Sequence, residues 1–186
     1  MNVNIGKFVQ ELVKSISDEN TFDIVLEKYR DSKETWDKIA RREIGKIVKN
    51  VFSNSFPHLN IKEALYIEGE GTPEGWKKPY DLFGSNGVYP DIGILKPKRV
   101  SIELDHSGWE RTEIPGSKFK IALAKASFGY LSGDWEYCYV FFHNHSGRSM
   151  EEYLSREREK EILKKYEEIF HTRIILFERN KTLNFL

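Results

Sequence analysis

Apolar positions recur every three or four residues through the first third of the chain. One such set lies in residues 5–16, a shorter one in 22–29, and a third in 36–51. This spacing places apolar side chains on one face of a helix. Asp31 or Ser32 can cap the third segment, because their side chains accept hydrogen bonds from backbone amides. The pattern therefore predicts amphipathic helices over these three segments.

The middle of the chain changes to the short apolar runs that are typical of strands. Residues 64–67, 88–95 and 100–105 form such runs, and Lys-Pro-Lys-Arg separates the last two. A Gly- and Pro-rich connection over 68–87 joins the first run to the second. Loops of that length in compact domains usually have a function. We predict three strands, of which the last two form a hairpin.

Helices and strands then alternate to the end of the chain. A helix is expected from residue 116 or 117 to 131, and the dense apolar run 135–142 is typical of a central buried strand. A charged helix over 149–170 and a strand over 173–177 follow. This order predicts an α/β or α+β sandwich, in which helices flank a mixed central sheet.

No composition shift, internal repeat or low-complexity segment marks a boundary between domains. The chain of 186 residues fits within one domain. We therefore predict a single domain over 1–186, with N-terminal helices in 1–53, a core in 60–145, and a C-terminal helix and strand in 149–186.

Charge and composition limit the classes of function. The 29 basic residues balance 29 acidic ones, so the formal net charge is zero. Such a chain does not coat nucleic acid by bulk electrostatics, and any such contact must come from local basic groups. No run approaches the ~20 apolar residues of a membrane span, and no signal-peptide pattern is present. The single cysteine, Cys138, fits a small core residue in a reducing cytoplasm.

Two carboxylates alternate along the second strand of the predicted hairpin. Glu103 and Asp105 are two residues apart and share one face, whereas Ile102 and Leu104 point to the core. Like charges on one face are costly unless they are exposed or bind a cation. Hard divalent ions such as Mg²⁺ prefer such oxygen-rich settings. The alternative is a solvated sheet edge whose charges discourage aggregation.

The turn of the hairpin decides whether Asp91 can join these carboxylates. A turn of four residues, 96–99, places Asp91 opposite Leu104, where it points the wrong way. A turn of three residues, 96–98, places it opposite Glu103 on the same face, and a bulge has the same effect. A three-carboxylate site therefore requires an odd turn or a bulge.

Pro90-Asp91 followed by Glu103-Leu104-Asp105 resembles the motif of the PD-(D/E)xK, or restriction-endonuclease-like, nuclease superfamily. The resemblance covers roughly residues 40–145 and includes the family's order of helix, three strands, helix and strand. It implies a Mg²⁺-dependent endonuclease that hydrolyses phosphodiester bonds of double-stranded DNA, with Mn²⁺ able to replace Mg²⁺. Asp91 and Glu103 would hold the metal, and the Leu104 carbonyl could be a further ligand.

Asp105 stands where the family motif carries a lysine that orients the attacking water. Some members carry Glu or Gln there and remain active. Asp105 could act as a general base or bind a second metal ion. Alternatively, Lys118, Lys120 or Lys125 of the following helix could reach the site, because a lysine amine sits on a flexible stem. Two other interpretations are a catalytically inactive module that binds DNA or a protein, and an unrelated α/β protein with a chance match.

The resemblance also implies further acidic and basic groups. It places a glutamate on the helix before the hairpin, where Glu43 fits, with Glu68 and Glu70 as alternatives. A homodimer would allow both DNA strands to be cut. Basic groups that flank the site would contact the DNA: Lys77, Lys78, Lys96, Lys98, Arg99, Lys118 and Lys120.

The letters His-Asn-His at 143–145 do not form the HNH nuclease motif, whose residues are spread over a ββα unit. A zinc site there would need His106 or His171 as further ligands. His106, next to Asp105, could instead contact phosphate or donate a proton. No P-loop, dinucleotide glycine motif or nucleophile elbow is present.

Overall fold

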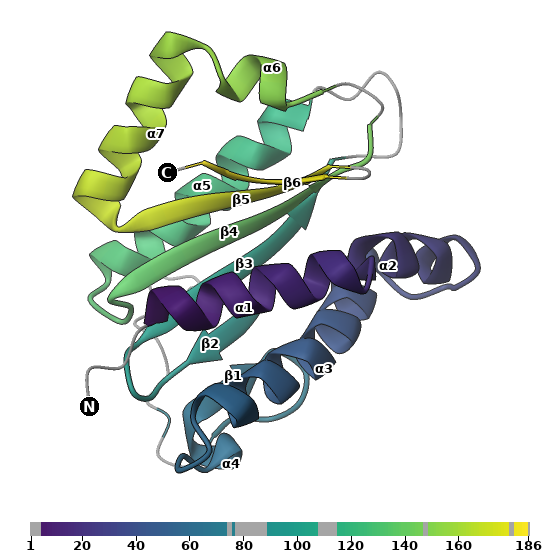
Figure 1. Cartoon of the computed structure of the whole chain (residues 1–186), viewed down its shortest axis with the longest axis vertical. Coiled ribbons are helices and arrows are strands. Elements are labelled where there is room, and N and C mark those ends of the chain that lie inside the picture. Colours follow the sequence, from purple (N-terminus) through teal and green to yellow (C-terminus); the bar gives the residue numbers. More distant parts are fainter. Residues whose placement is uncertain are drawn as a thin grey trace. The chain divides into compact units, whose positions relative to one another are not determined.

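The computed structural model describes residues 5–73, 76, 89–107, 115–146, 149–178 and 181–185, without the side chains of 115–117 and 181–185. Contacts divide the chain into two compact units: unit 1 is Met1–Lys77 with Asp91–Arg99, and unit 2 is Lys78–Pro90 with Val100–Leu186. Helices are combined with parallel and antiparallel strand pairs (Figure 1), so the predicted mixed α/β class is confirmed. The single domain remains a prediction.

Unit 1 is mainly helical and ends in a short two-stranded ribbon. Its elements are α1 (Ile5–Asp18), α2 (Thr21–Arg30), α3 (Trp36–Ser55), α4 (Ile61–Ala64), β1 (Leu65–Ile67) and β2 (Ile92–Ile94). The predicted cap of α3 is wrong: Thr35 accepts a hydrogen bond from the Lys38 amide at 3.4 Å, whereas Ser32 accepts one from Glu34 N in the preceding turn. The four-residue α4 was not predicted, because one turn shows no period.

Aromatic rings join the helices of unit 1. Phe8 of α1 lies 6.2 Å from Phe52 and 5.5 Å from Phe56, between ring centroids. Phe22 of α2 stacks on Trp36 of α3 at 6.1 Å. Burial of such side chains stabilises a helix that is too short to persist alone. The long helix α3 is thus the element on which α1 and α2 pack.

The ribbon of unit 1 brings the chain to the first predicted site residue. β1 pairs antiparallel with β2, with Leu65 opposite Ile94 and Ile67 opposite Ile92. The pairing continues through a hydrogen bond from Glu68 N to Asp91 O at 2.9 Å. The strand predicted over 88–95 is therefore shorter, and Glu68 and Asp91 lie side by side at its end.

Unit 2 is a sheet with helical connections. Its elements are β3 (Val100–His106), α5 (Pro115–Leu131), β4 (Tyr137–Asn144), α6 (Glu151–Leu154), α7 (Glu157–Phe170), β5 (Thr172–Glu178) and β6 (Lys181–Phe185). β3 and β5 pair parallel with β4, and β6 pairs antiparallel with β5. One charged helix over 149–170 was expected, but Arg156 adopts an extended conformation that separates α6 from α7. β6 was not predicted.

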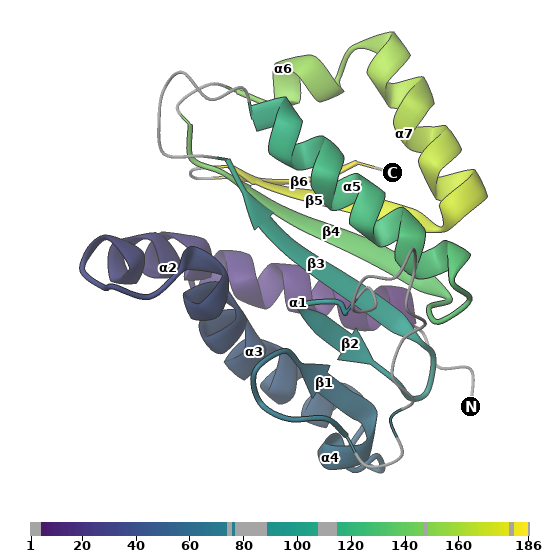
Figure 2. The same ribbon diagram turned by 180° about the vertical axis from the view of Figure 1, so that it is seen from behind.

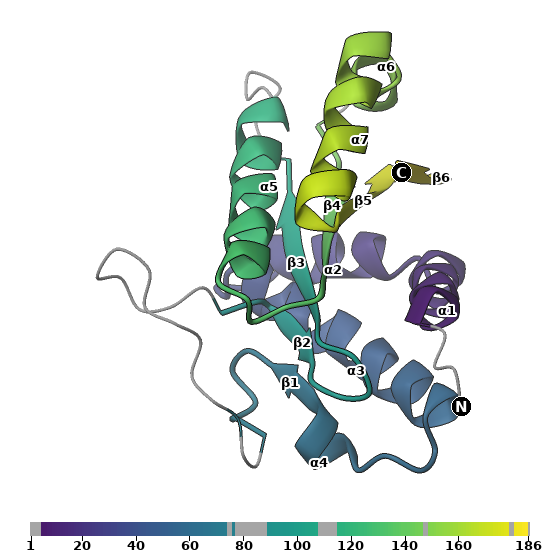
Figure 3. The ribbon, with the colours of Figure 1, turned by 90° about the vertical axis from the view of Figure 1, so that its left-hand side faces the viewer.

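Helices α5 and α7 lie side by side on one face of this sheet (Figures 1, 2 and 3). The Phe119 ring of α5 meets the Phe142 ring of β4 edge-on, with 5.4 Å between centroids. Phe142 is the neighbour of Asp105 in the β3–β4 register, and Val140 is the neighbour of Glu103. Side chains of residues in register share a face. Glu103 and Asp105 therefore project to the α5 side of the sheet.

Candidate functional site

Glu103 and Asp105 form a carboxylate pair on β3. Glu103 is 4% exposed, and Asp105 is half-buried nearer the carboxyl end of the strand. One Asp105 oxygen, Oδ1, accepts a hydrogen bond from the His106 amide at 2.8 Å. Carboxylates are seldom buried unless they are paired or coordinate a metal. The shared face predicted for these two residues is confirmed.

Asp91 lies in unit 1, directly before β2, and is 8% exposed. Arg41 of α3 donates a hydrogen bond from Nη1 to Asp91 Oδ1 at 3.1 Å. The same Nη1 forms an ion pair with Glu68 Oε2. Asp91 and Glu68 are therefore two anions that share one guanidinium nitrogen.

Asp91 and Glu103 belong to different units. The meeting of these two carboxylates, and the odd turn or bulge that it requires, remain predictions. Within unit 2, the described residues offer Glu103 and Asp105 as partners on one strand. Within unit 1, they offer Asp91 and Glu68 around Arg41.

The donor set fits a lightly held hard cation better than a closed metal centre. Among the described residues, no group of three or more His, Cys, Asp or Glu side chains is arranged to hold a metal ion. Mg²⁺ commonly keeps several waters and binds one or two carboxylates together with substrate phosphate oxygens. Glu103 and Asp105 supply that number of oxygen donors from a single strand.

The lysines proposed to replace the missing motif lysine lie on α5. The β3–α5–β4 crossover places the start of α5 at the carboxyl end of β3, the end that carries Asp105 (Figure 2). Lys118 is half-buried and Lys120 is exposed, on either side of the Phe119 ring that packs on the sheet. In the described part of unit 2, neither amine forms a hydrogen bond or ion pair with Glu103 or Asp105. Both lysines remain candidates by position.

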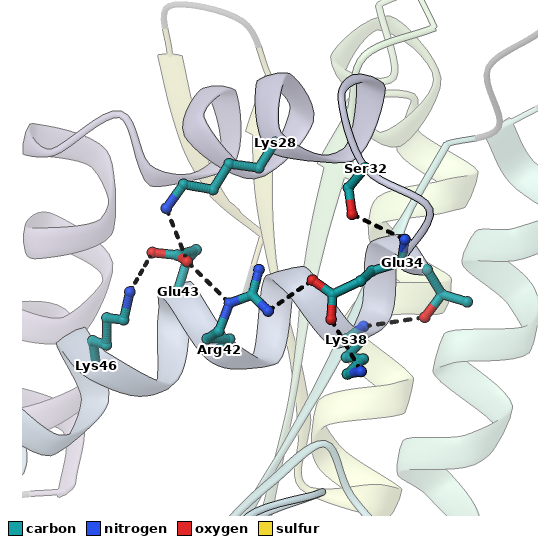
Figure 4. Close-up of polar contacts among 8 residues, drawn as sticks. Lys28, Ser32, Glu34, Lys38, Arg42, Glu43 and Lys46 are labelled. Carbon is teal, nitrogen blue, oxygen red and sulfur yellow. Dashed lines mark hydrogen bonds and ion pairs between the residues drawn. The ribbon is translucent and has the colours of Figure 1, made fainter.

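Glu43 is held by three cations (Figure 4). Its carboxylate contacts Lys28 Nζ at 2.9 Å, Lys46 Nζ at 2.8 Å and Arg42 Nε at 3.3 Å. Burial alone would raise the pKa of Glu43, but hydrogen bonds from Lys46, Lys28 and Arg42 outweigh it and lower the pKa to about 2. Arg42 also contacts Glu34 Oε2 at 2.8 Å. Glu43 thus joins α2 to α3 within an ion network.

The two alternatives to Glu43 also have cationic partners on α3. Glu68 pairs with Arg41, and Glu70 pairs with Lys49. All three acidic candidates of unit 1 are therefore engaged by basic residues of one helix. Each carboxylate is thus neutralised by at least one cation of α3, and the sequence pattern did not predict these ion pairs.

The basic residues proposed to contact DNA differ in their surroundings. Lys96 and Lys98 are exposed after β2, and Arg99 is half-buried. Lys96 Nζ lies 3.3 Å from Glu63 Oε2, in an exposed ion pair that contributes little. Lys77 and Lys78 lie outside the described residues.

A histidine cluster lies at the carboxyl ends of β3 and β4. The sequence named His106 only as one possible zinc partner of residues 143–145, and it did not predict that His106 and His145 meet. His106 Nδ1 lies 2.7 Å from the Ser107 carbonyl oxygen and 3.1 Å from His145 Nε2. A carbonyl only accepts hydrogen bonds, so His106 Nδ1 carries a proton and donates it to Ser107 O, and the longer contact with His145 Nε2 can only share that one proton. His106 is also in register with His143. The signal was the parallel pairing, which brings the ends of consecutive strands to one edge.

This cluster lies on the sheet face opposite to Glu103 and Asp105, because His106 alternates with Asp105 along β3. Burial, together with the nearby His145 and His106, lowers the pKa of His143 to about 3. His171 is elsewhere: it caps α7 and precedes β5, beside Tyr137. His106 and Asp105 therefore point to opposite faces of the sheet, and contact of His106 with phosphate remains a prediction.

Polar side chains also fasten the segment that follows β4. Glu178 Oε1 accepts hydrogen bonds from Asn144 Nδ2 at 2.9 Å and from Met150 N at 2.6 Å. Asn144 Oδ1 in turn accepts a hydrogen bond from Ser146 Oγ at 2.8 Å. These contacts hold both ends of residues 145–150 and give Asn144 a structural role.

No family model, curated protein or solved structure matches the chain. The nuclease resemblance therefore rests on the motif residues and on the order of elements. In that order, α3, β1, β2, β3, α5 and β4 follow one another, with the single turn α4 inserted. None of the described helices is both long and apolar enough to cross a membrane.

Proposed function

We propose that the chain is a Mg²⁺-dependent DNA endonuclease of the restriction-endonuclease-like type that acts in the cytoplasm. The observation that carries the proposal is the Glu103–Asp105 pair on one face of β3. Both residues lie toward the carboxyl end of β3, which pairs parallel with β4. Active sites of open α/β sheets commonly lie at the carboxyl ends of such strands. The proposal also takes Asp91, which directly precedes β2, as a metal ligand, as the motif resemblance implies.

The residues have separate roles in this proposal. When bound, Mg²⁺ supplies a coordinated water of lowered pKa and neutralises charge on the phosphate. Glu103, which is buried, and Asp91 hold the ion. Asp105 is half-buried and can accept a proton from the attacking water as a general base, or provide a further ligand. Lys118 or Lys120 brings positive charge from α5.

Duplex DNA is the proposed substrate, and its backbone needs cations around the carboxylates. Lys96 and Lys98 are exposed on the turn after β2, next to Arg99. Lys77 and Lys78 complete the basic set in the sequence. A second copy of the chain would supply the site for the opposite strand.

Two observations favour a second candidate function. Arg41 contacts Asp91, and Asp105 replaces the motif lysine, so the proposed site carries an altered set of charges. A nuclease-like core with such changes can persist as a module that binds DNA or a protein without cutting. Binding of a duplex without divalent-dependent cleavage would select this alternative.

Cleavage assays with purified protein test the endonuclease. Linear, branched, supercoiled and single-stranded DNA are incubated with Mg²⁺, with Mn²⁺ or with EDTA. We expect divalent-dependent cleavage that leaves 5′-phosphate and 3′-hydroxyl ends. Asp91→Asn and Glu103→Gln each lower the rate at least about 100-fold, because each removes a donor from a site that stabilises transition-state charge.

The matched control is Glu161→Gln, an isosteric change of an exposed glutamate on α7 whose partner is Lys165 at 3.1 Å. This variant cleaves like the wild type. Circular dichroism confirms that all variants are folded. If the wild type cuts none of these substrates with either ion, the endonuclease proposal fails.

A further inference from the structure

Arg41 contacts Asp91 at Oδ1, one of the two oxygens through which this carboxylate could bind a metal ion. Its Nη1 lies 3.1 Å from Asp91 Oδ1 and also pairs with Glu68 Oε2. The Arg41 side chain is 20% exposed and that of Asp91 11%. Screening by water is therefore incomplete, so the guanidinium and the carboxylate interact more strongly than an exposed pair.

The contact has two effects on a divalent ion that approaches Asp91. The guanidinium takes one lone pair of Asp91 Oδ1, so a metal ion at this oxygen must share it with a hydrogen bond and finds a weaker donor. The positive charge of Arg41 also repels the incoming cation.

We propose that Arg41 is an internal counter-cation that competes with the divalent ion for Asp91. Arg41 thereby raises the metal concentration at which the site fills. The inference rests on the proposed function, since it takes Asp91 as a metal ligand. Arg41 acts through Asp91 and is a regulatory positioning residue, not a catalytic one. Glu68 is the alternative partner that holds the guanidinium when Asp91 binds the ion.

The neighbouring residue supplies a matched control. Arg42 lies on the same helix and is also ion-paired, but its partners are Glu34 and Glu43. Arg42→Gln removes the same charge from the chain without touching Asp91. A general effect of net charge would appear in both variants, whereas competition at Asp91 appears only in Arg41→Gln.

The experiment is a Mn²⁺ titration of the full chain, followed by electron paramagnetic resonance of the free ion. We expect Arg41→Gln to bind Mn²⁺ about tenfold more tightly than the wild type, because a nearby positive charge and a competing donor are lost. Arg42→Gln should bind within about twofold of the wild type, where only a screened surface charge changes. In Arg41→Gln with Asp91→Asn, the gain should disappear.

A second variant is needed in case Arg41→Gln unfolds the protein because Glu68 has lost its Arg41 partner. Arg41→Gln with Glu68→Gln replaces this ion pair by two neutral amides, so Glu68 is not left as a charge without Arg41. It should still bind Mn²⁺ more tightly than Glu68→Gln alone, which is its reference because both lack the Glu68 charge. This pair of variants separates competition at Asp91 from a loss of folding.

Each outcome decides between the two proposals. Unchanged or weaker Mn²⁺ binding in Arg41→Gln, with a wild type that binds and cleaves, overturns the competition and leaves the nuclease. Tighter binding in Arg41→Gln, with no cleavage by any variant, supports the competition and overturns the nuclease. No Mn²⁺ binding by the wild type or by either Arg41 variant overturns both.

Discussion

The buried imidazole of His143 links the protonation of one residue to the stability of the fold. The residue is 2% exposed, and burial lowers its pKa from 6.5 to about 3. The unfolded chain therefore binds a proton between these two values that the folded chain excludes. Stability from the neutral ring is complete above about pH 6.5 and is lost as the pH falls toward about 3.

Unfolding in urea at a series of pH values checks this expectation. Between pH 7 and pH 4, the wild type should lose several kcal/mol of unfolding free energy, since one pKa unit corresponds to about 1.4 kcal/mol. His143→Gln, which cannot titrate, should lose less over the same interval. His58→Gln, a change at an exposed residue, should follow the wild type. Equal slopes for wild type and His143→Gln would contradict the assignment.

Single residues differ in how far sequence predicts their surroundings. The shared face of Glu103 and Asp105 follows from alternation along one strand, so it was predicted correctly. The contact of Arg41 with Asp91 joins residues 50 positions apart, and no periodic pattern carries that information. The choice between His106 and His171 as neighbours of residues 143–145 was left open, because it depends on the register of β3 with β4, which the apolar pattern of either strand does not specify.

At the scale of elements, Glu43 is the ionic link between α2 and α3. Lys28 reaches it from α2, and Arg42 and Lys46 reach it from α3. The folded-state pKa of about 2 lies below the ordinary value of 4.5. This group therefore contributes stability above about pH 4.5, and the contribution is lost as the pH falls through about 2.

Glu43→Gln should lower the unfolding free energy at pH 7 by up to about 3 kcal/mol, the limit set by the pKa shift. The difference from the wild type should shrink between about pH 4.5 and about pH 2, where the wild-type carboxylate gains its proton. Denaturant titrations at several pH values measure both effects. Glu161→Gln on α7, with an exposed partner, should change stability by less than about 0.5 kcal/mol. A Glu43→Gln effect that does not depend on pH would argue against the ion network.

Element boundaries were predicted less well than element types. Periodicity located the segments that became α1, α2, α3, α5 and β3, because those patterns extend over many residues. The start of α3 was misplaced, since Ser32 and Thr35 have similar capping chemistry and only the backbone decides between them. The break at Arg156 was missed because charged residues continue on both sides of it.

For the whole molecule, the balanced charge is expressed as local ion pairs. In unit 1, cations of α2 and α3 contact nearby carboxylates: Lys28, Lys38, Arg41, Arg42, Lys46 and Lys49. Because these cations are already paired with carboxylates, they should contribute little to binding a phosphate backbone. Binding of DNA would then depend on the small basic set proposed above.

The salt dependence of duplex binding measures that set. Each phosphate contact contributes about −0.9 to the slope of the logarithm of the binding constant against the logarithm of the salt concentration. With seven proposed basic residues, that slope should be no steeper than about −6. Lys96→Ala with Lys98→Ala should make the slope shallower by about two. Lys164→Ala with Lys165→Ala, on exposed positions of α7, should leave it unchanged. A slope of about −10 in the wild type would mean that other cations bind the DNA.

The fold class followed from the order of patterns along the chain, whereas the division into two units did not. Unit 1 takes Asp91–Arg99 from the far side of a long connection, because β2 pairs with β1. Such pairing depends on which strands meet in space. A pattern that repeats every two or four residues does not encode it.

The parallel pairing of β3 with β4 also has a consequence for synthesis on the ribosome. β3 ends at His106, and its partner begins only at Tyr137, so residues 107–136 must emerge before the two strands can pair. A strand edge whose partner has not yet been made is a template for association with other chains. Ser101, Glu103 and Asp105 make one face of the waiting strand polar and charged. The residues proposed to hold a metal in the finished protein should thus also discourage aggregation of β3 before β4 is made.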